Sequence, residues 1–134
     1  METPFKAYDG NEPCIFVSYS HSDRDAVFKC LAHLHSRGFR IWYDEGIEPG
    51  ASWYDVLAER IASAACMLLF MSSHSQRSPY ISKEITCAIA KRKHIVCVVL
   101  DGCEVEGAFE LMLCDTQMMS RSDGAFYEKL EKAL

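Results

Sequence analysis

The 134-residue chain lacks an apolar run of about 18 residues, the length needed for a membrane-spanning helix. It also lacks a signal-peptide pattern, an internal repeat and a low-complexity segment, which argues against a secreted, repetitive or largely disordered chain. An excess of positive charge is absent as well: the formal net charge is −5, and the overall field does not favour nucleic acid or an anionic membrane. These absences predict one cytoplasmic domain with neither nucleic acid nor membrane as a partner.

Several catalytic and metal-binding motifs are also missing. The sequence has no C-x-x-C pair, although it contains seven cysteines, and no Cys or His spacing suits zinc. It has no G-x-S-x-G or G-x-x-x-x-G-K motif, and its five histidines form no triad spacing with a nucleophile. An odd number of cysteines, several inside apolar runs, is typical of buried free thiols in a reducing cytosol. We therefore expect no metal site, no disulfide framework, no serine-hydrolase triad and no P-loop.

The sequence does contain short apolar runs separated by helical patterns. Residues 1–12 are mostly polar and are predicted to form a flexible N-terminal segment, followed by a domain over residues 13–134. The runs predict strands at residues 14–19, 39–43, 65–71 and 95–100, with a weaker strand at 116–119. Most of these runs are continuously apolar rather than alternating, which predicts a parallel sheet covered on both faces.

Helical patterns fill the gaps between these strands. Apolar residues from Val27 to Leu34 recur at i, i+3, i+4 and i+7 and predict a helix that ends before Gly38. Ser52 is predicted to cap a second helix, and Ser78, followed by proline, a third. Weaker patterns predict helices at 109–113 and 126–134.

Alternating strands and helices predict βαβ units with right-handed crossovers and therefore a doubly wound α/β fold. In such sheets ligands bind outside the carboxyl ends of the strands. The loops after Tyr19, Tyr43 and Met71 follow three of the predicted strands. We therefore expect the functional site at these three loops.

Three segments near these loops resemble a known family. Residues 15–20, with the sequence Ile-Phe-Val-Ser-Tyr-Ser, are similar to the first signature box of TIR (Toll/interleukin-1 receptor) domains. Residues 38–50 resemble the second strand and the BB loop of that family, and residues 78–84 resemble the helix that holds a W-x-x-x-E signature in enzymatic TIR domains. The order and spacing of the three segments make the match specific, and it extends from about Pro13 to the end of the chain, in wording closest to bacterial TIR domains.

The resemblance implies a flavodoxin-like, doubly wound fold with five parallel strands in the order 2-1-3-4-5 and helices on both faces. It also implies two functional classes, since some TIR domains cleave NAD⁺ by hydrolysis or cyclisation and others are non-enzymatic scaffolds that recruit further TIR domains. It favours an NAD⁺ nucleosidase of bacterial immune signalling, with NAD⁺ as substrate and no cofactor, and leaves a linear or a cyclic product open. A receiver-like domain is disfavoured because the first strand is not followed by the acidic cluster that a receiver needs.

Glu84 is the catalytic residue that the resemblance implies. Nicotinamide leaves NAD⁺ as a neutral molecule from a cationic state, so one carboxylate that stabilises the developing oxocarbenium charge can suffice. Glu84 lies early in its predicted helix, where the helix dipole favours an ionised carboxylate. Tyr80 stands where the family signature has Trp and keeps an aromatic face one turn away. The competing interpretation of Glu84 is a solvated surface charge beside Lys83.

The resemblance also implies substrate contacts for four residues outside that helix. Trp53 would line the nucleotide pocket, although it could equally cap the core at the start of its helix. Tyr19 and Ser20 close the first strand, where free backbone N–H groups could bind a pyrophosphate, although plain helix capping is the favoured alternative. Asp44 ends the second strand, and a turn-stabilising role is favoured for it over a substrate contact.

The BB loop, from Asp44 to Ser52, is the interaction segment that the resemblance implies. Its central residues are Gly46, Ile47, Glu48, Pro49 and Gly50. Self-association with other TIR domains through this loop is expected in both functional classes. In the enzymatic class it would complete or activate the site.

Overall fold

The computed structural model describes residues 3–45 and 52–134 of the chain. Its core is a five-stranded sheet in the order β2-β1-β3-β4-β5, and every pairing in it is parallel. The strands are β1 (Ile15–Ser18), β2 (Ile41–Trp42), β3 (Cys66–Met71), β4 (His94–Val99) and β5 (Gln117–Ser120). This order confirms the predicted doubly wound α/β fold.

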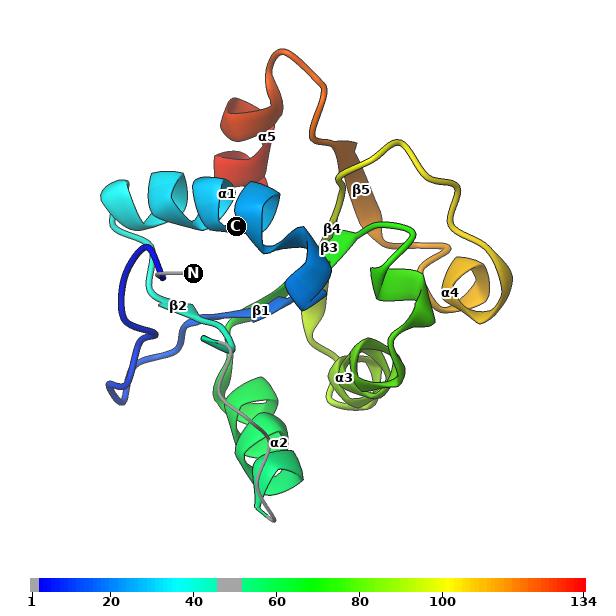
Figure 1. The fold of residues 1–134 in the computed structure, drawn as a ribbon. Helices are drawn as coiled ribbons and strands as arrows, with labels where there is room; N and C mark the ends of the chain where they lie inside the picture. Colours follow the sequence, from blue (N-terminus) through cyan, green and yellow to red (C-terminus); the bar gives the residue numbers. More distant parts are fainter. Residues whose placement is uncertain (1–2, 46–51) are drawn as a thin grey trace.

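Helices cover both faces of the sheet, as predicted (Figure 1). The α-helices are α1 (Arg24–Ser36), α2 (Trp53–Ser63), α3 (Pro79–Ala90), α4 (Gly107–Met112) and α5 (Phe126–Ala133). Two short 3₁₀ helices, η1 (His21–Asp23) and η2 (Ser75–Arg77), follow β1 and β3. In Figure 1, α1 and α5 lie on one side of the sheet, and α2, α3 and α4 lie on the other.

The core consists of two layers because successive residues of a strand point to opposite faces. On β1, Ile15 and Val17 pack in the layer beneath α1 and α5, whereas Phe16 packs in the layer beneath α2 and α3. Phe16 is only 1% exposed, and burial of a side chain of this size stabilises the fold by roughly 1.5–3 kcal/mol. Both faces of the central strands β1 and β3 are therefore buried, and a site on these strands can form only where they end.

Helix ends follow the predicted signals at three positions. Gly38 has a φ of +91°, the left-handed conformation that ends a helix and that glycine adopts without strain. Ser78 caps α3, because its hydroxyl accepts a hydrogen bond from the N–H of Ile81 at 3.4 Å, and Pro79 takes the first helical position. Ser52 takes the N-cap position of α2, as predicted, but its side chain makes no capping hydrogen bond.

The second strand is shorter than the predicted range of 39–43. The N–H of Phe39 donates to the carbonyl of Leu34, so Phe39 belongs to the turn that ends α1. Only Ile41 and Trp42 pair with β1. Tyr43 and Asp44 lie beyond the paired region, at the carboxyl edge of the sheet.

The N-terminal segment lies along the outer edge of β2. The N–H of Tyr8 donates to the carbonyl of Ile41 at 2.8 Å, and the ring of Phe5 stacks on His35 at a centroid distance of 4.1 Å. The N–H of Ala7 donates to Glu45 at 3.2 Å. These contacts show where the segment lies, and its flexibility stays a prediction.

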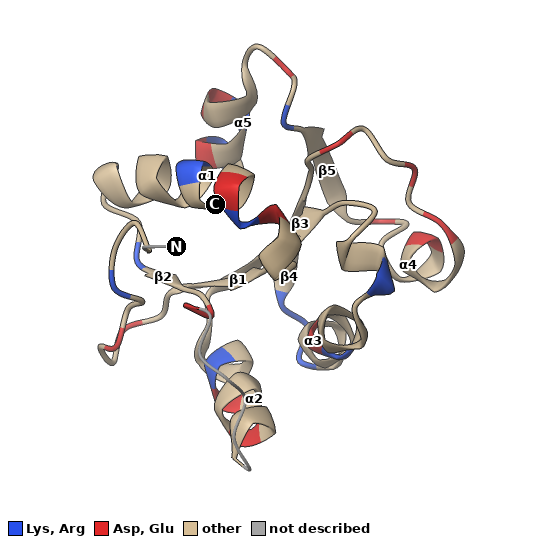
Figure 2. Cartoon of the chain, in the orientation of Figure 1, with Lys and Arg blue, Asp and Glu red and all other residues tan. Residues whose placement is uncertain are grey.

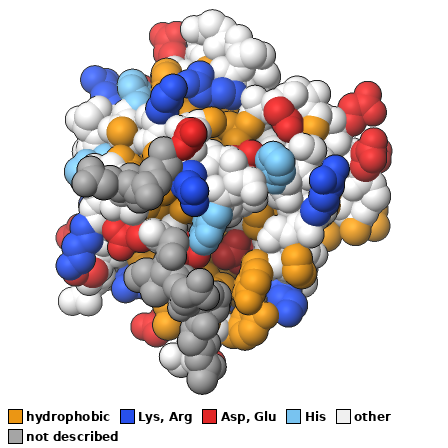
Figure 3. Space-filling model, in the orientation of Figure 1, with side chains coloured by type: hydrophobic (Ala, Val, Ile, Leu, Met, Phe, Trp, Pro, Cys, Tyr) orange, Lys and Arg blue, Asp and Glu red, His pale blue; other side chains and the backbone are white. Residues whose placement is uncertain are grey.

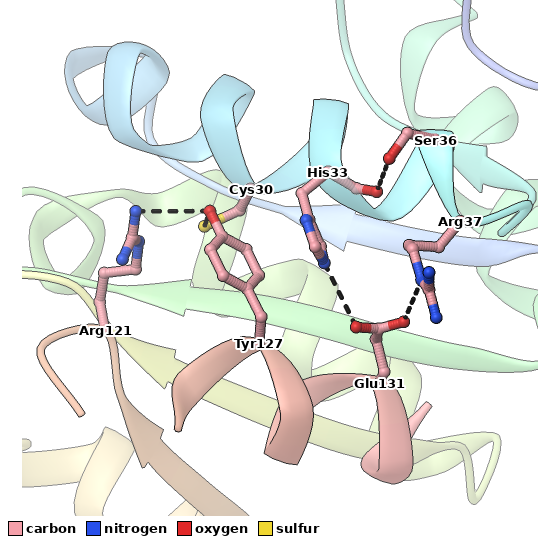
Figure 4. Close-up of polar contacts among 7 residues, drawn as sticks. All are labelled: Cys30, His33, Ser36, Arg37, Arg121, Tyr127 and Glu131. Carbon is pink, nitrogen blue, oxygen red and sulfur yellow. Dashed lines mark hydrogen bonds and ion pairs between the residues drawn. The ribbon is translucent and has the colours of Figure 1, made fainter. Parts of the chain in front are cut away.

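The C-terminal helix is joined to α1 by a polar cluster (Figure 4). Glu131 on α5 accepts hydrogen bonds from Arg37 at 2.8 Å and pairs with His33 at 3.2 Å. The ring of Tyr127 lies against His33, with ring centroids 4.0 Å apart. We name this group, Arg37, His33, Glu131 and Tyr127, the α1–α5 cluster.

Charged residues are spread over the outside of this architecture (Figure 2). Among the described helices, none is long and apolar enough to cross a membrane. All seven cysteines are free thiols: four are buried, Cys87 and Cys103 are half-buried, and Cys114 is exposed.

Candidate functional site

A cavity of about 320 Å³ opens at the carboxyl ends of β1 and β2, beside the first turns of α2 and α3. Its lining consists of Val17, Tyr19, Ser20, His21, Trp42, Asp44, Trp53, Ser78, Tyr80, Ile81 and Glu84. Figure 3 shows this side of the molecule, with histidine, acidic and hydrophobic side chains next to one another near its centre. The six residues predicted for catalysis and substrate binding, Glu84, Tyr80, Trp53, Tyr19, Ser20 and Asp44, all line this one cavity.

Glu84 lies where α3 meets the end of β1. Its neighbours Ile81 and Ile85 are buried in the core layer beneath α2 and α3, and this anchors the helix against the sheet. The Glu84 carboxylate accepts a hydrogen bond from the hydroxyl of Ser18 at 2.7 Å, and Ser18 is itself only 1% exposed. The carboxylate is therefore held against the sheet and is not a freely solvated surface charge.

Burial raises the pKa of Glu84 to about 7, because desolvation disfavours the charged form of a carboxyl group. The hydrogen bond from Ser18 and the nearby His21 lower this pKa, whereas the like charge of Asp44 raises it further. Desolvation is the largest of these effects. Glu84 thus changes its charge near neutral pH, a property common in functional carboxyl groups.

Aromatic rings form the apolar part of the cavity wall. Trp42 stacks on Phe16 with ring centroids 5.1 Å apart, and Trp53 lies 6.4 Å from Trp42. Trp53 packs against the core and also lines the cavity, so capping the core and lining the pocket, the two alternatives given for it, are compatible. Tyr80 is 41% exposed at the rim and stacks on Tyr54 at 5.8 Å. These faces suit a planar ring.

The rest of the wall is polar and joins β1 to β2. The hydroxyl of Tyr19 donates a hydrogen bond to the backbone carbonyl of Asp44. The side chain of Asp44 pairs with Nε2 of His21 at 3.0 Å. The hydrogen bond with Asp44 raises the pKa of His21, and burial opposes this effect. Asp44 therefore stabilises the loop and also places a charge at the cavity.

The backbone N–H groups after β1 are largely occupied. Ser20 caps η1, because its hydroxyl accepts the N–H of Ser22 at 3.3 Å and its carbonyl accepts that of Asp23 at 2.9 Å. The N–H of Arg24 donates to the carbonyl of His21. The capping interpretation of Ser20 therefore describes this turn, and these three N–H groups are not directed at a ligand.

The loop after β3 contributes less to the cavity than expected. Ser72 donates to the carboxylate of Asp23 at 2.5 Å, and Ser73 donates to Asp101 at 3.2 Å. These bonds fix the loop to its neighbours along the sheet edge. Only Ser78, at the end of this loop, lines the cavity.

Sequence reasoning did not assign to this site Ser18, which bonds Glu84, or the lining residues Val17, His21, Trp42, Ser78 and Ile81. Ser18 lies inside the first signature box, but its role depends on Glu84, 66 positions away in the chain. His21 was considered only as one of five histidines that form no triad spacing with a nucleophile, although its position beside the cap residue Ser20 could have suggested an exposed side chain. Trp42 was assigned only to a strand end.

Two further predictions concern the BB loop and metal binding. The BB-loop residues Gly46, Ile47, Glu48, Pro49 and Gly50 lie outside the described residues. Within residues 3–45 and 52–134, no group of three His, Cys, Asp or Glu side chains is arranged to hold a metal ion.

The fold and the cavity define a doubly wound α/β domain in which the side chain of Glu84 lies near the C-terminal ends of the strands. A family model described as "TIR domain" matches residues 15–134. The chain therefore belongs to the TIR domain family. A comparison with curated protein sequences finds no significant match.

Solved structures are similar in fold at low sequence identity. The TIR domain of a Toll-related receptor from Hydra magnipapillata has a TM-score of 0.74 and 15% identity, over 88% of this chain and 94% of that one. A TIR-STING receptor from C. gigas has a TM-score of 0.73 and 22% identity; the match includes 96% of this chain and 42% of that chain. A CMP N-glycosidase from Clostridium botulinum has a TM-score of 0.65 and 14% identity, over 90% and 98% of the two chains.

Proposed function

We propose that this TIR domain cleaves the bond between nicotinamide and ribose in NAD⁺, with Glu84 as the catalytic residue. The observation that supports this most directly is the position of Glu84, a desolvated carboxyl group in the wall of a cavity that also presents aromatic rings. The structural neighbour from Clostridium botulinum is named for N-glycosidase activity on CMP, which supports N-glycosidic bond cleavage as a chemistry compatible with this fold.

The proposed mechanism uses the ionised form of Glu84. As the bond to nicotinamide breaks, positive charge develops on the ribose, and a nearby carboxylate in a water-poor cavity stabilises that charge strongly. The nicotinamide ring departs neutral, so no general acid is required. NAD⁺ brings a positive ring towards Glu84, and this opposite charge lowers the pKa of the carboxyl group in the complex. Substrate binding thereby favours the reactive form.

The other lining residues are proposed to bind and orient the substrate. The faces of Trp53 and Tyr80 would contact the nicotinamide ring or its ribose. Ser18 would hold the Glu84 carboxylate in one orientation through its 2.7 Å hydrogen bond. Once nicotinamide has left, the positively charged ribose can react with water or with a second nucleophile within the substrate. The proposal therefore includes both a hydrolase and a cyclase activity.

The test is to incubate purified protein with NAD⁺ at high protein concentration and to separate the products by chromatography. Release of nicotinamide that is abolished in Glu84→Gln supports the proposal, and the second product distinguishes ADP-ribose from a cyclic isomer. Retained activity in Glu84→Gln contradicts the assigned mechanism. Absence of release in the wild type, also under crowding that promotes assembly, contradicts the enzymatic proposal.

A non-enzymatic scaffold is the second candidate, and one observation favours it. Tyr54 and Tyr80 are exposed by 53% and 41% and stack on each other beside the cavity, and apolar surface of this kind suits a protein partner. A scaffold would associate without turnover, and its association would survive Glu84→Gln. Sedimentation of both forms at several concentrations, beside the NAD⁺ assay, separates the candidates. In the enzymatic case, we propose that self-association raises the turnover per molecule, in a role in bacterial immune signalling.

A further inference from the structure

We propose that His21 recognises the pyrophosphate of a dinucleotide substrate and that this recognition requires its imidazole to be protonated. The inference rests on the proposed function and deepens it by assigning the charged half of the substrate to one side chain. The sequence analysis considered the backbone N–H groups of the same turn as the pyrophosphate site, whereas the inference assigns this role to the side chain of His21.

The charge of the cavity motivates the proposal. NAD⁺ carries two negative charges on its pyrophosphate, whereas the cavity contains the carboxyl groups of Asp44 and Glu84. Among its described lining residues, His21 is the one side chain that can become a cation. Without a positive charge at that position, the two carboxylates would repel the substrate that the aromatic walls attract.

The geometry leaves His21 available to a ligand. Its Nε2 atom lies 3.0 Å from Oδ2 of Asp44, and its side chain is 47% exposed. A protonated imidazole has a second N–H donor on Nδ1, and the hydrogen bond that the described residues make with the ring uses Nε2 instead. The N–H groups of Ser22, Asp23 and Arg24 are paired within the turn, so the side chain of His21 is the better candidate for an anion.

The groups that face His21 decide its charge. The hydrogen bond with Asp44 is the largest effect and raises the pKa of His21 above its ordinary value of 6.5. The negative charge of Glu84 raises this pKa too, whereas burial and the positive charge of Arg24 lower it. His21 and Glu84 therefore favour the charged state of each other.

This arrangement gives turnover two pH limits. Ionisation of Glu84 makes kcat/KM rise as the pH increases through about 7. The pKa of His21 is raised above its ordinary value, and loss of its proton makes the KM for NAD⁺ rise as the pH increases. Nicotinamide riboside has the same scissile bond but no pyrophosphate, and its profile should show only the first limit.

The experiment compares NAD⁺ with nicotinamide riboside in His21→Gln and His21→Arg. We expect His21→Gln to raise the KM for NAD⁺ about tenfold or more, the effect of one charge-assisted hydrogen bond. The change for nicotinamide riboside should be much smaller, because that substrate responds only to the loss of the His21 charge beside Glu84. His21→Arg should restore the KM for NAD⁺ and remove the alkaline limit. His94→Gln is the control and should match the wild type, because His94 lies at the amino-terminal start of β4, whereas the cavity lies at the carboxyl ends of the strands.

Equal effects of His21→Gln on both substrates would overturn the proposal and assign His21 to positioning of Glu84. The inference can be tested even if neither substrate is cleaved, because ADP-ribose carries the pyrophosphate without the scissile bond. Calorimetry should then show ADP-ribose binding that weakens about tenfold in His21→Gln and weakens in the wild type as the pH rises. Binding that is absent in the wild type, or independent of His21 and pH, would overturn it.

Discussion

Glu84 and Glu131 are two carboxyl groups that each lie near a histidine, yet their environments shift their pKa values in opposite directions. Within the α1–α5 cluster, Glu131 pairs with Arg37 and His33, and these partners lower its pKa. Among the residues that the structure describes, Glu84 is hydrogen-bonded by the Ser18 hydroxyl alone, and desolvation raises its pKa to about 7.

The difference teaches how one fold separates stability from chemistry. A carboxylate that is compensated by opposite charges joins two helices and keeps one charge state over the physiological range. A desolvated carboxylate costs stability when it ionises, and the chain retains it at the mouth of a cavity. Four predictions test this contrast, in order of decreasing effect.

The largest expected effect is on turnover. Glu84→Gln should lower the rate of nicotinamide release at least about 100-fold, because the neutral amide cannot stabilise the oxocarbenium charge. Glu131→Gln should leave this rate unchanged and should lower the melting temperature, since the ion pairs of the α1–α5 cluster are lost. Rates at saturating NAD⁺ and melting curves of both variants provide the measurement. Similar loss of activity in both would remove the contrast.

The second effect is on the pH dependence of stability. The folded state binds the Glu84 proton more tightly than the unfolded state, whose pKa is near 4.5, so the free energy of unfolding should fall as pH rises from about 4.5 to about 7. This loss amounts to at most about 3 kcal/mol. The pKa of Glu131 is lowered, so its contribution should have the opposite sign: stability should be lost as the pH falls below 4.5, the ordinary pKa of a glutamate.

Urea unfolding at several pH values measures both slopes. Glu84→Gln should remove the loss of stability between about pH 4.5 and pH 7 and should exceed the wild type in stability at neutral pH. Glu131→Gln should remove only part of the loss at acid pH. A wild-type stability that rises steadily up to neutral pH, with no gain in Glu84→Gln, would contradict the desolvation of Glu84.

The third effect concerns the hydrogen bond between Ser18 and Glu84. Ser18→Ala removes a donor to the ionised carboxylate, so the pKa of Glu84 should rise by about one unit and the acid limit of kcat/KM should move to higher pH. Activity at pH 7 should fall several-fold and recover at higher pH. Ser72→Ala is the control, because Ser72 bonds Asp23 outside the cavity and should leave the limit in place.

The smallest effect concerns the aromatic rim. Tyr80→Ala should raise the KM for NAD⁺ about fivefold through loss of one aromatic contact, whereas Tyr80→Phe and Tyr80→Trp should keep it. In the α1–α5 cluster, Tyr127→Ala should lower the melting temperature and leave KM unchanged. A KM that does not respond to Tyr80→Ala would place the substrate ring elsewhere in the cavity.

Much of the fold could be predicted because local patterns encode it. Continuous apolar strands indicated a parallel sheet covered on both faces, and Gly38 and Ser78 marked helix ends correctly. The second strand was predicted too long, because the bond of Phe39 to Leu34 depends on how α1 ends and not on the apolar character of the segment.

The candidate site could be predicted only in outline. The resemblance to TIR domains identified Glu84 and five neighbours, which gather around one cavity. Ser18 and His21 were not assigned to it, since a serine in a strand and a histidine in a capping segment carry no signal by themselves. Their partners, Glu84 and Asp44, lie 66 and 23 positions away in the chain.

The sequence by itself determined the order of strands and helices along the chain, the two-sided core and the presence of a carboxyl group in the second turn of α3. Only the tertiary structure decided that Glu84 would be desolvated and that His21 would pair with Asp44. The physical reason is that periodicity and capping act between residues a few positions apart. A pKa instead depends on solvent and charges within a few ångströms, which folding brings together from distant parts of the chain.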